Sequence, residues 1–125
     1  MKAFLINPNK LNPIEDFIPE RLDWLIKKII DDKEWSKPIA IAKEHNLVMD
    51  GHHRLQASIR LGLKKVPCFV FSYQDIVPYS LREDIEVNSD KIIENFLLSK
   101  IYPNKTAKHD LSFPKFKPIS LDELK

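Results

Sequence analysis

The chain has very little cysteine, little net charge and no long apolar run. Its only cysteine, Cys68, allows neither an intrachain disulfide nor a thiolate metal cluster, and its apolar neighbours predict a buried side chain. No apolar stretch approaches the roughly 20 residues that a membrane-spanning helix needs. A formal charge of +2 without a concentrated basic stripe argues against a nucleic-acid partner. Because the apolar run at residues 3–6 is too short for a secretory signal, we expect a cytoplasmic protein with no membrane partner.

The chain has 125 residues, of which 43% are hydrophobic, so it is long enough for one domain with one core. Apolar, β-rich stretches predict four strands, at residues 2–6, 38–42, 47–49 and 65–71. Apolar side chains at helical spacing predict helices at about residues 19–32, 55–61 and 88–97, and a short one at 75–83 that is interrupted near Pro78. Prolines predict an extended arm at residues 102–118, and residues 120–123 form a capping-box pattern for a last turn.

The segment Asp50-Gly-His-His-Arg54 is the most informative part of the sequence. It lies between an apolar stretch and a predicted helix, which is the layout of a strand-to-helix turn that holds an anion. Gly51 lets the backbone approach a ligand closely, and the helix N-terminus offers free N–H groups. Arg54 can hold phosphate oxygens in a bidentate manner, and Asp50 could hold Mg²⁺ beside them. The segment therefore predicts a binding site for nucleotide phosphates.

Two other interpretations of this segment remain open. Its histidines could belong to a polar loop, where they would cap a helix or form local hydrogen bonds. A zinc site is disfavoured, because the adjacent side chains of His52 and His53 point apart on either a strand or a helix. No cysteine stands near them as a further ligand.

Two other segments carry groups suited to the same chemistry. Glu15 lies in a loop beside Asp16, and by composition alone both acids are ordinary solvated residues. Lys105, Thr106 and His109 lie in the predicted arm, where together they could clamp a carboxylate or a phosphate. A short basic run of this kind is equally compatible with a solvated surface.

Taken together, these segments resemble the ParB/sulfiredoxin superfamily, and within it most closely the free L-serine kinases. The similar stretches are Leu11–Glu15, Trp35–Ile39, Asp50–Arg54 with the following helix, and Ile101–His109. The resemblance implies an α+β fold: one compact domain over residues 1–125, with a small mixed sheet, helices packed around it and an extended C-terminal arm. It implies a core at about residues 1–73, and a C-terminal helix and substrate-binding arm at about 88–125.

The resemblance also implies a reaction, the transfer of a phosphoryl group from ATP or ADP, with Mg²⁺, to the hydroxyl of free L-serine. The product is O-phospho-L-serine. It assigns proton abstraction to Glu15, and the orientation of Mg²⁺ or the acceptor to Asp50. The implied phosphate-binding residues are Gly51, His52, His53 and Arg54, with the last three neutralising charge, and the implied serine-binding residues are Lys105, Thr106 and His109.

The sequence departs from its relatives at a few positions. Ala107 and Lys108 stand where the serine kinases have threonine and arginine, and His52 stands where sulfiredoxins have their cysteine. Without that thiol, sulfiredoxin chemistry has no nucleophile. The alternative function is a ParB-like regulatory module that binds or hydrolyses a nucleotide and is associated with DNA. The oligomeric state cannot be predicted from these patterns.

Overall fold

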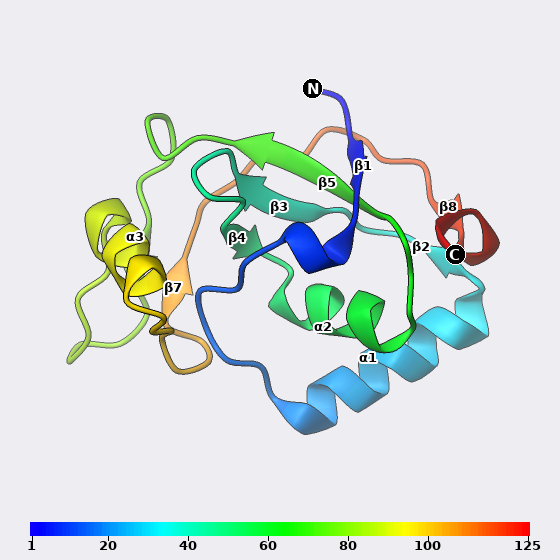
Figure 1. Cartoon of the computed structure of the whole chain (residues 1–125), viewed down its shortest axis with the longest axis horizontal. Coiled ribbons are helices and arrows are strands. Elements are labelled where there is room, and N and C mark those ends of the chain that lie inside the picture. The colour runs from blue at the N-terminus through cyan, green and yellow to red at the C-terminus, as the bar shows by residue number, and fades with distance from the viewer.

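A four-stranded mixed sheet forms the centre of the molecule (Figure 1). The computed structural model describes all residues, 1–125. The strands, in the order in which they pair, are β1 (Phe4–Ile6), β5 (Val66–Phe71), β3 (Ile39–Ala42) and β4 (Val48–Asp50). Strands β3 and β5 are parallel, and the other two pairs are antiparallel. Because parallel strands need a crossover connection, the chain between them passes through α2 (His52–Arg60). The four predicted strands and the mixed sheet are confirmed.

Strand β3 divides the hydrophobic core between the two faces of the sheet. Ile39 and Ile41 belong to the larger cluster, whereas Ala40 and Ala42 belong to the smaller one. This alternation follows from the period of two residues along a strand, and all four side chains are buried. The sheet is therefore covered on both sides.

The larger cluster is covered by α1 (Pro19–Asp32) and α2, which run along the same side of the sheet (Figure 1). Pro19 occupies the first turn of α1, where a missing N–H costs nothing. Leu22, Leu25 and Ile29 are the buried residues of this helix, as their spacing predicted. Cys68 lies in the same cluster, so its predicted burial is also confirmed.

The smaller cluster is covered by α3 (Ser89–Leu97), which lies at the end of the molecule remote from the C-terminus (Figure 1). The Asn88 side chain caps this helix by accepting a hydrogen bond of 2.7 Å from the Lys91 N–H. Ile92 is its one fully buried residue, and it packs in a cluster that also contains Tyr102 from the arm.

Two-stranded pairs fasten the C-terminal arm to the rest of the chain. Strand β7 (Ala107–Lys108) pairs with β6 (Tyr79–Ser80), and β8 (Ile119–Ser120) pairs with β2 (Glu34–Trp35). The arm is extended, as predicted. Two short 3₁₀ helices, η1 (Pro8–Lys10) and η2 (Leu121–Leu124), complete the structure. No helix is both long enough and apolar enough to cross a membrane.

Three details of the sequence prediction are wrong. The helix predicted at 75–83 is absent, because the chain turns at residues 73–75 and then pairs with the arm as β6. Helix α2 begins at His52 and not at residue 55, so the histidines form its first turn. A last turn does form as η2, but the Ser120 side chain makes no capping hydrogen bond.

Candidate functional site

Gly51 connects β4 to α2 in a conformation that favours glycine and in a tight space beside Ile39. Its φ of 108° lies in the left-handed region that other residues rarely adopt. A Cβ atom at this position would also lie 3.3 Å from Cγ1 of Ile39. No side chain caps the N-terminus of α2, so the first-turn N–H groups are free for a ligand.

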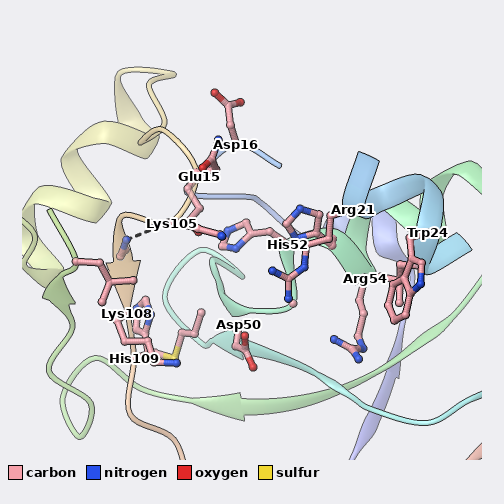
Figure 2. A pocket seen from close by; sticks show the side chains of 17 residues that line it. Glu15, Asp16, Arg21, Trp24, Asp50, His52, Arg54, Lys105, Lys108 and His109 are labelled. Carbon is pink, nitrogen blue, oxygen red and sulfur yellow. Dashed lines mark hydrogen bonds between the residues drawn. The ribbon is translucent and has the colours of Figure 1, made fainter. Parts of the chain in front are cut away.

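A cavity of about 310 Å³ opens at this helix N-terminus (Figure 2). The structure brings eight of the nine predicted site residues to its wall: Glu15, Asp50, Gly51, His52, His53, Arg54, Lys105 and His109. They come from the N-terminal loop, the β4–α2 junction and the C-terminal arm. The wall also contains Asp16, Arg21, Trp24, Leu25, Met49, Leu81, Asn104, Ala107 and Lys108.

Glu15 is held against the C-terminal arm by its carboxylate. Its Oε2 atom accepts hydrogen bonds from the N–H groups of Thr106, at 3.2 Å, and Ala107, at 3.0 Å. Its Oε1 atom accepts none, and is free toward a ligand. Burial raises the pKa of the Glu15 carboxyl above its ordinary value, although these backbone hydrogen bonds act in the opposite direction. A half-buried carboxylate with one free oxygen is suited to accept a proton.

The two adjacent histidines hold the segment that carries Glu15. Nε2 of His52 accepts a hydrogen bond of 3.1 Å from the Ile14 N–H, and Nε2 of His53 accepts one of 2.9 Å from the Ile18 N–H. Each ring must therefore be neutral, with its proton on Nδ1. Burial lowers the pKa of His52 to about 3. The implied role of the two imidazoles as charge-neutralising groups is thus not what the geometry supports; they act as hydrogen-bond acceptors.

Positive charge in the cavity comes instead from arginine and lysine. The cavity wall contains four cationic side chains, those of Arg21, Arg54, Lys105 and Lys108. None of them lies within 4.0 Å of a carboxylate oxygen. The carboxylate of Asp50 forms a loose pair with Lys37, at 3.7 Å, and about half of each side chain is exposed. Such an exposed pair contributes little to stability and leaves Asp50 able to bind another partner. The cavity therefore has unpaired positive charge for a polyanion.

Thr106 is the predicted site residue whose side chain does not reach the cavity. It is fully buried, and its hydroxyl donates a hydrogen bond of 2.7 Å to the Pro103 carbonyl. The same hydroxyl accepts a hydrogen bond of 3.0 Å from Nε of Arg82, whose Nη2 donates to the Asn104 carbonyl at 2.8 Å. Thr106 therefore shapes the arm, and it meets the site through its main-chain N–H to Glu15.

His109 lies in the wall with one ring nitrogen committed to a neighbour. Its Nε2 atom is 3.0 Å from the hydroxyl of Tyr73, and its Nδ1 atom is buried without a hydrogen-bond partner. Burial lowers the pKa of His109 to about 4, so the ring is neutral near pH 7. With Nε2 bonded to Tyr73 and Nδ1 buried, the ring contributes neither charge nor an open nitrogen to the cavity.

Four residues that form or support the site were not predicted from the sequence: Arg21, Trp24, Lys108 and Arg82. The first two lie on α1, whose apolar spacing predicted only its core face, and Lys108 was noted only as a departure from the relatives. No local signal marks Arg82, because its partners lie more than 20 residues away. No group of three or more acidic, histidine or cysteine side chains forms a closed metal site.

The chain was compared with models of known protein families. The profile of the ParB N-terminal domain matches residues 2–96, about three quarters of the chain. The chain belongs to the ParB N-terminal domain family. The β4–α2 junction of the cavity lies inside the matched region, whereas the arm beyond residue 96 lies outside it.

Two curated relatives and one solved structure are similar to this ParB-domain chain. An ATP-dependent L-serine kinase of Staphylothermus marinus is 40% identical over 79 residues, which is 60% of this chain and 31% of that protein. A ParB-like protein of Sulfolobus acidocaldarius is 35% identical over 68 residues, 54% of this chain and 34% of that protein. The matches thus span about a third of the curated relatives. A free serine kinase in complex with AMP superposes with a TM-score of 0.88 at 17% identity, covering 100% of this chain and 94% of that one, which shows a shared fold.

Proposed function

We propose that residues 1–125 form one domain that transfers a phosphoryl group from ATP or ADP to the hydroxyl of free L-serine, giving O-phospho-L-serine. The observation that carries the proposal is a single cavity that contains a free carboxylate oxygen of Glu15 and four unpaired cations. Phosphoryl transfer needs positioning, charge neutralisation and a base for the acceptor hydroxyl, and little covalent chemistry from the protein. The similarity to a named L-serine kinase supports this reading.

The donor side of the reaction belongs to the β4–α2 junction. The free N–H groups after Gly51 cradle the donor phosphates, and the guanidinium groups of Arg54 and Arg21 neutralise their charge. His52 adds a neutral Nδ1–H donor on the wall of the cavity, while its Nε2 atom holds the Glu15 segment. This donor site is confined to the core of the domain, at about residues 1–73.

The acceptor side lies between the N-terminal loop and the arm at about residues 88–125. Glu15 takes the proton from the serine hydroxyl as its oxygen attacks the terminal phosphorus, and the bond to the nucleotide oxygen breaks. Lys105 and Lys108 bind the serine carboxylate, and the neutral ring of His109 lines the wall beside them. Thr106 contributes its main chain to the position of Glu15.

Asp50 is the residue that would hold Mg²⁺. Its half-exposed carboxylate lines the cavity beside the phosphate cradle, and it is a hard oxygen ligand of the type that Mg²⁺ prefers. The absence of a closed group of three acidic ligands fits this ion, because Mg²⁺ usually binds through one or two carboxylates together with substrate phosphates. Mg²⁺ supplies charge neutralisation of the donor phosphates when bound.

The proposal is tested by incubating the purified protein with Mg²⁺, L-serine and either ATP or ADP, and detecting the product by mass spectrometry. We expect phosphoserine with at least one of the two nucleotides, and no product when serine is omitted. Parallel reactions with L-threonine and L-homoserine test the acceptor. If neither nucleotide gives phosphoserine, the proposed reaction is wrong; if only another alcohol reacts, the kinase class stands and the acceptor is corrected.

The similarity to a ParB-like protein favours a second function, a regulatory module that binds or hydrolyses a nucleotide. The same phosphate cradle and cations would serve it, but Glu15 would have no acceptor hydroxyl to deprotonate. In the reaction above, this function gives nucleotide binding or slow hydrolysis whose rate does not depend on serine. Serine-dependent transfer therefore separates the two functions.

A further inference from the structure

An exposed tryptophan stands at one end of the cavity. Trp24 lies on α1 with 63% of its surface exposed, although it lines the cavity together with Arg21 and Arg54. In Figure 2, Trp24 and Arg54 lie at one end of the group of side chains, and Lys108 and His109 lie at the other. Residues 21 and 24 are three positions apart on α1, so their side chains project from the same face of the helix.

The order of groups along the cavity matches the order of parts in a nucleotide. Glu15 and the lysines of the arm occupy one end, and His52, the first residue of α2, lies between them and the α1 end (Figure 2). In-line transfer requires the terminal phosphate to face the acceptor, so the nucleoside must extend the opposite way. That direction leads past Arg54 to the indole of Trp24.

We infer that Trp24 is the surface on which the nucleobase of the donor stacks, with the apolar wall of Leu25 beside it. The inference rests on the proposed function and adds a base subsite to it. An indole offers a large rigid face to a planar base, and stacking of one base on an aromatic side chain is worth about 1–3 kcal/mol. The indole is 63% exposed at the rim of a cavity that is lined mostly by polar residues.

Removal of the indole should weaken the binding of nucleotides but not the binding of polyphosphates that lack a base. We expect Trp24→Ala to weaken ATP binding by about 5- to 100-fold, measured by calorimetry, and Trp24→Phe to keep most of the affinity. The affinity for inorganic tripolyphosphate, which shares the phosphates but has no base, should stay within about twofold. Equal ATP affinity in Trp24→Ala and wild type, or an equal loss for tripolyphosphate, overturns the inference.

Intrinsic fluorescence gives an independent reading, because the second tryptophan of the chain is buried. Trp35 is only 1% exposed, so acrylamide quenches mainly Trp24. Saturating ATP should protect wild-type emission from acrylamide, and the Trp24→Phe protein should show no such protection. Absence of protection in the wild type at saturating ATP contradicts stacking.

The phosphoserine assay separates failure of this inference from failure of the proposed function. If Trp24→Ala makes phosphoserine with an unchanged KM for the nucleotide, the base subsite is wrong and the kinase stands. If ATP binding depends on Trp24 but no acceptor alcohol is phosphorylated, the base subsite stands and the kinase proposal is wrong.

Discussion

The chemistry proposed for this chain depends on single atoms of a few residues. Glu15 lines the cavity, and because its Oε2 accepts from the N–H groups of Thr106 and Ala107, Oε1 is the oxygen left for a ligand. The same arrangement sets two opposing influences on the pKa: burial disfavours the charged carboxylate, and the N–H donors favour it. Burial is the larger influence, so Glu15 stays protonated to a higher pH than an ordinary glutamate.

This pKa predicts the pH dependence of the reaction. A protonated Glu15 cannot accept the serine proton, so kcat/KM for serine should fall as the pH drops through the raised pKa. The acid limb of the profile should have its midpoint above 4.5, the ordinary value for glutamate. Glu20→Gln, which changes an exposed acid in the first turn of α1, should keep that limb. A flat profile down to pH 4.5 would contradict the role of Glu15 as the base.

Replacement of His52 should lower both the free energy of unfolding and the turnover, because its ring holds the Glu15 segment. Leucine at this position leaves the buried Ile14 N–H without its acceptor, which should cost about 1–3 kcal/mol of unfolding free energy in urea. The Glu15 segment should also loosen, so kcat should fall more than KM rises. Glutamine places a carbonyl oxygen near the position of Nε2, and His52→Gln should recover much of both losses. The account of His52 is wrong if His52→Leu unfolds at the same urea concentration as wild type.

At the scale of the elements, one arginine reinforces the strand pair that holds the arm at the site. Strand β6 brings Arg82 to the arm, where its guanidinium binds Thr106 Oγ1 and the Asn104 carbonyl. The arm in turn presents its N–H groups to Glu15 and its lysines to the cavity. Arg82 is thus a positioning residue for the acceptor side, while the donor cradle lies on other elements.

Loss of this arginine should therefore affect serine and not the nucleotide. We expect Arg82→Ala to raise KM for serine about tenfold, because about 1–3 kcal/mol of charged hydrogen bonding is lost from the arm. The affinity for ATP should change by less than about twofold. Arg60→Ala removes an arginine whose pair with Asp23, at 3.9 Å, lies outside the cavity, and serves as a matched control with unchanged KM. Parallel losses for serine and ATP would show that Arg82 supports the fold in general.

The parts of the structure that could be predicted are those determined by residues close together in the sequence. The spacing of Leu22, Leu25 and Ile29 predicted α1, and apolar spacing likewise predicted α3 at about residues 88–97. The segment at 75–83 was misread because its pairing with residues 107–108 is a non-local contact that outweighs the local helical pattern.

At the scale of the whole molecule, the site is made by contacts between segments far apart in the chain. Glu15 and Thr106 are separated by 91 positions, so no local pattern could join them; only the resemblance to a family did so. Arg82 and Trp24 escaped prediction for the same reason. Their roles depend on how the arm packs on β6 and how α1 packs beside α2, and neither arrangement leaves a trace in the spacing of nearby residues.

The most direct test of the account is the rate of phosphoserine formation by the Glu15→Gln protein at saturating serine, nucleotide and Mg²⁺. Glutamine preserves the shape and the two hydrogen bonds from the arm but cannot take a proton. We predict a turnover lower than wild type by about 10²–10⁴-fold, with nucleotide binding retained, while Glu20→Gln turns over normally. Wild-type turnover by Glu15→Gln would contradict the assignment of this cavity as a kinase site with Glu15 as its base.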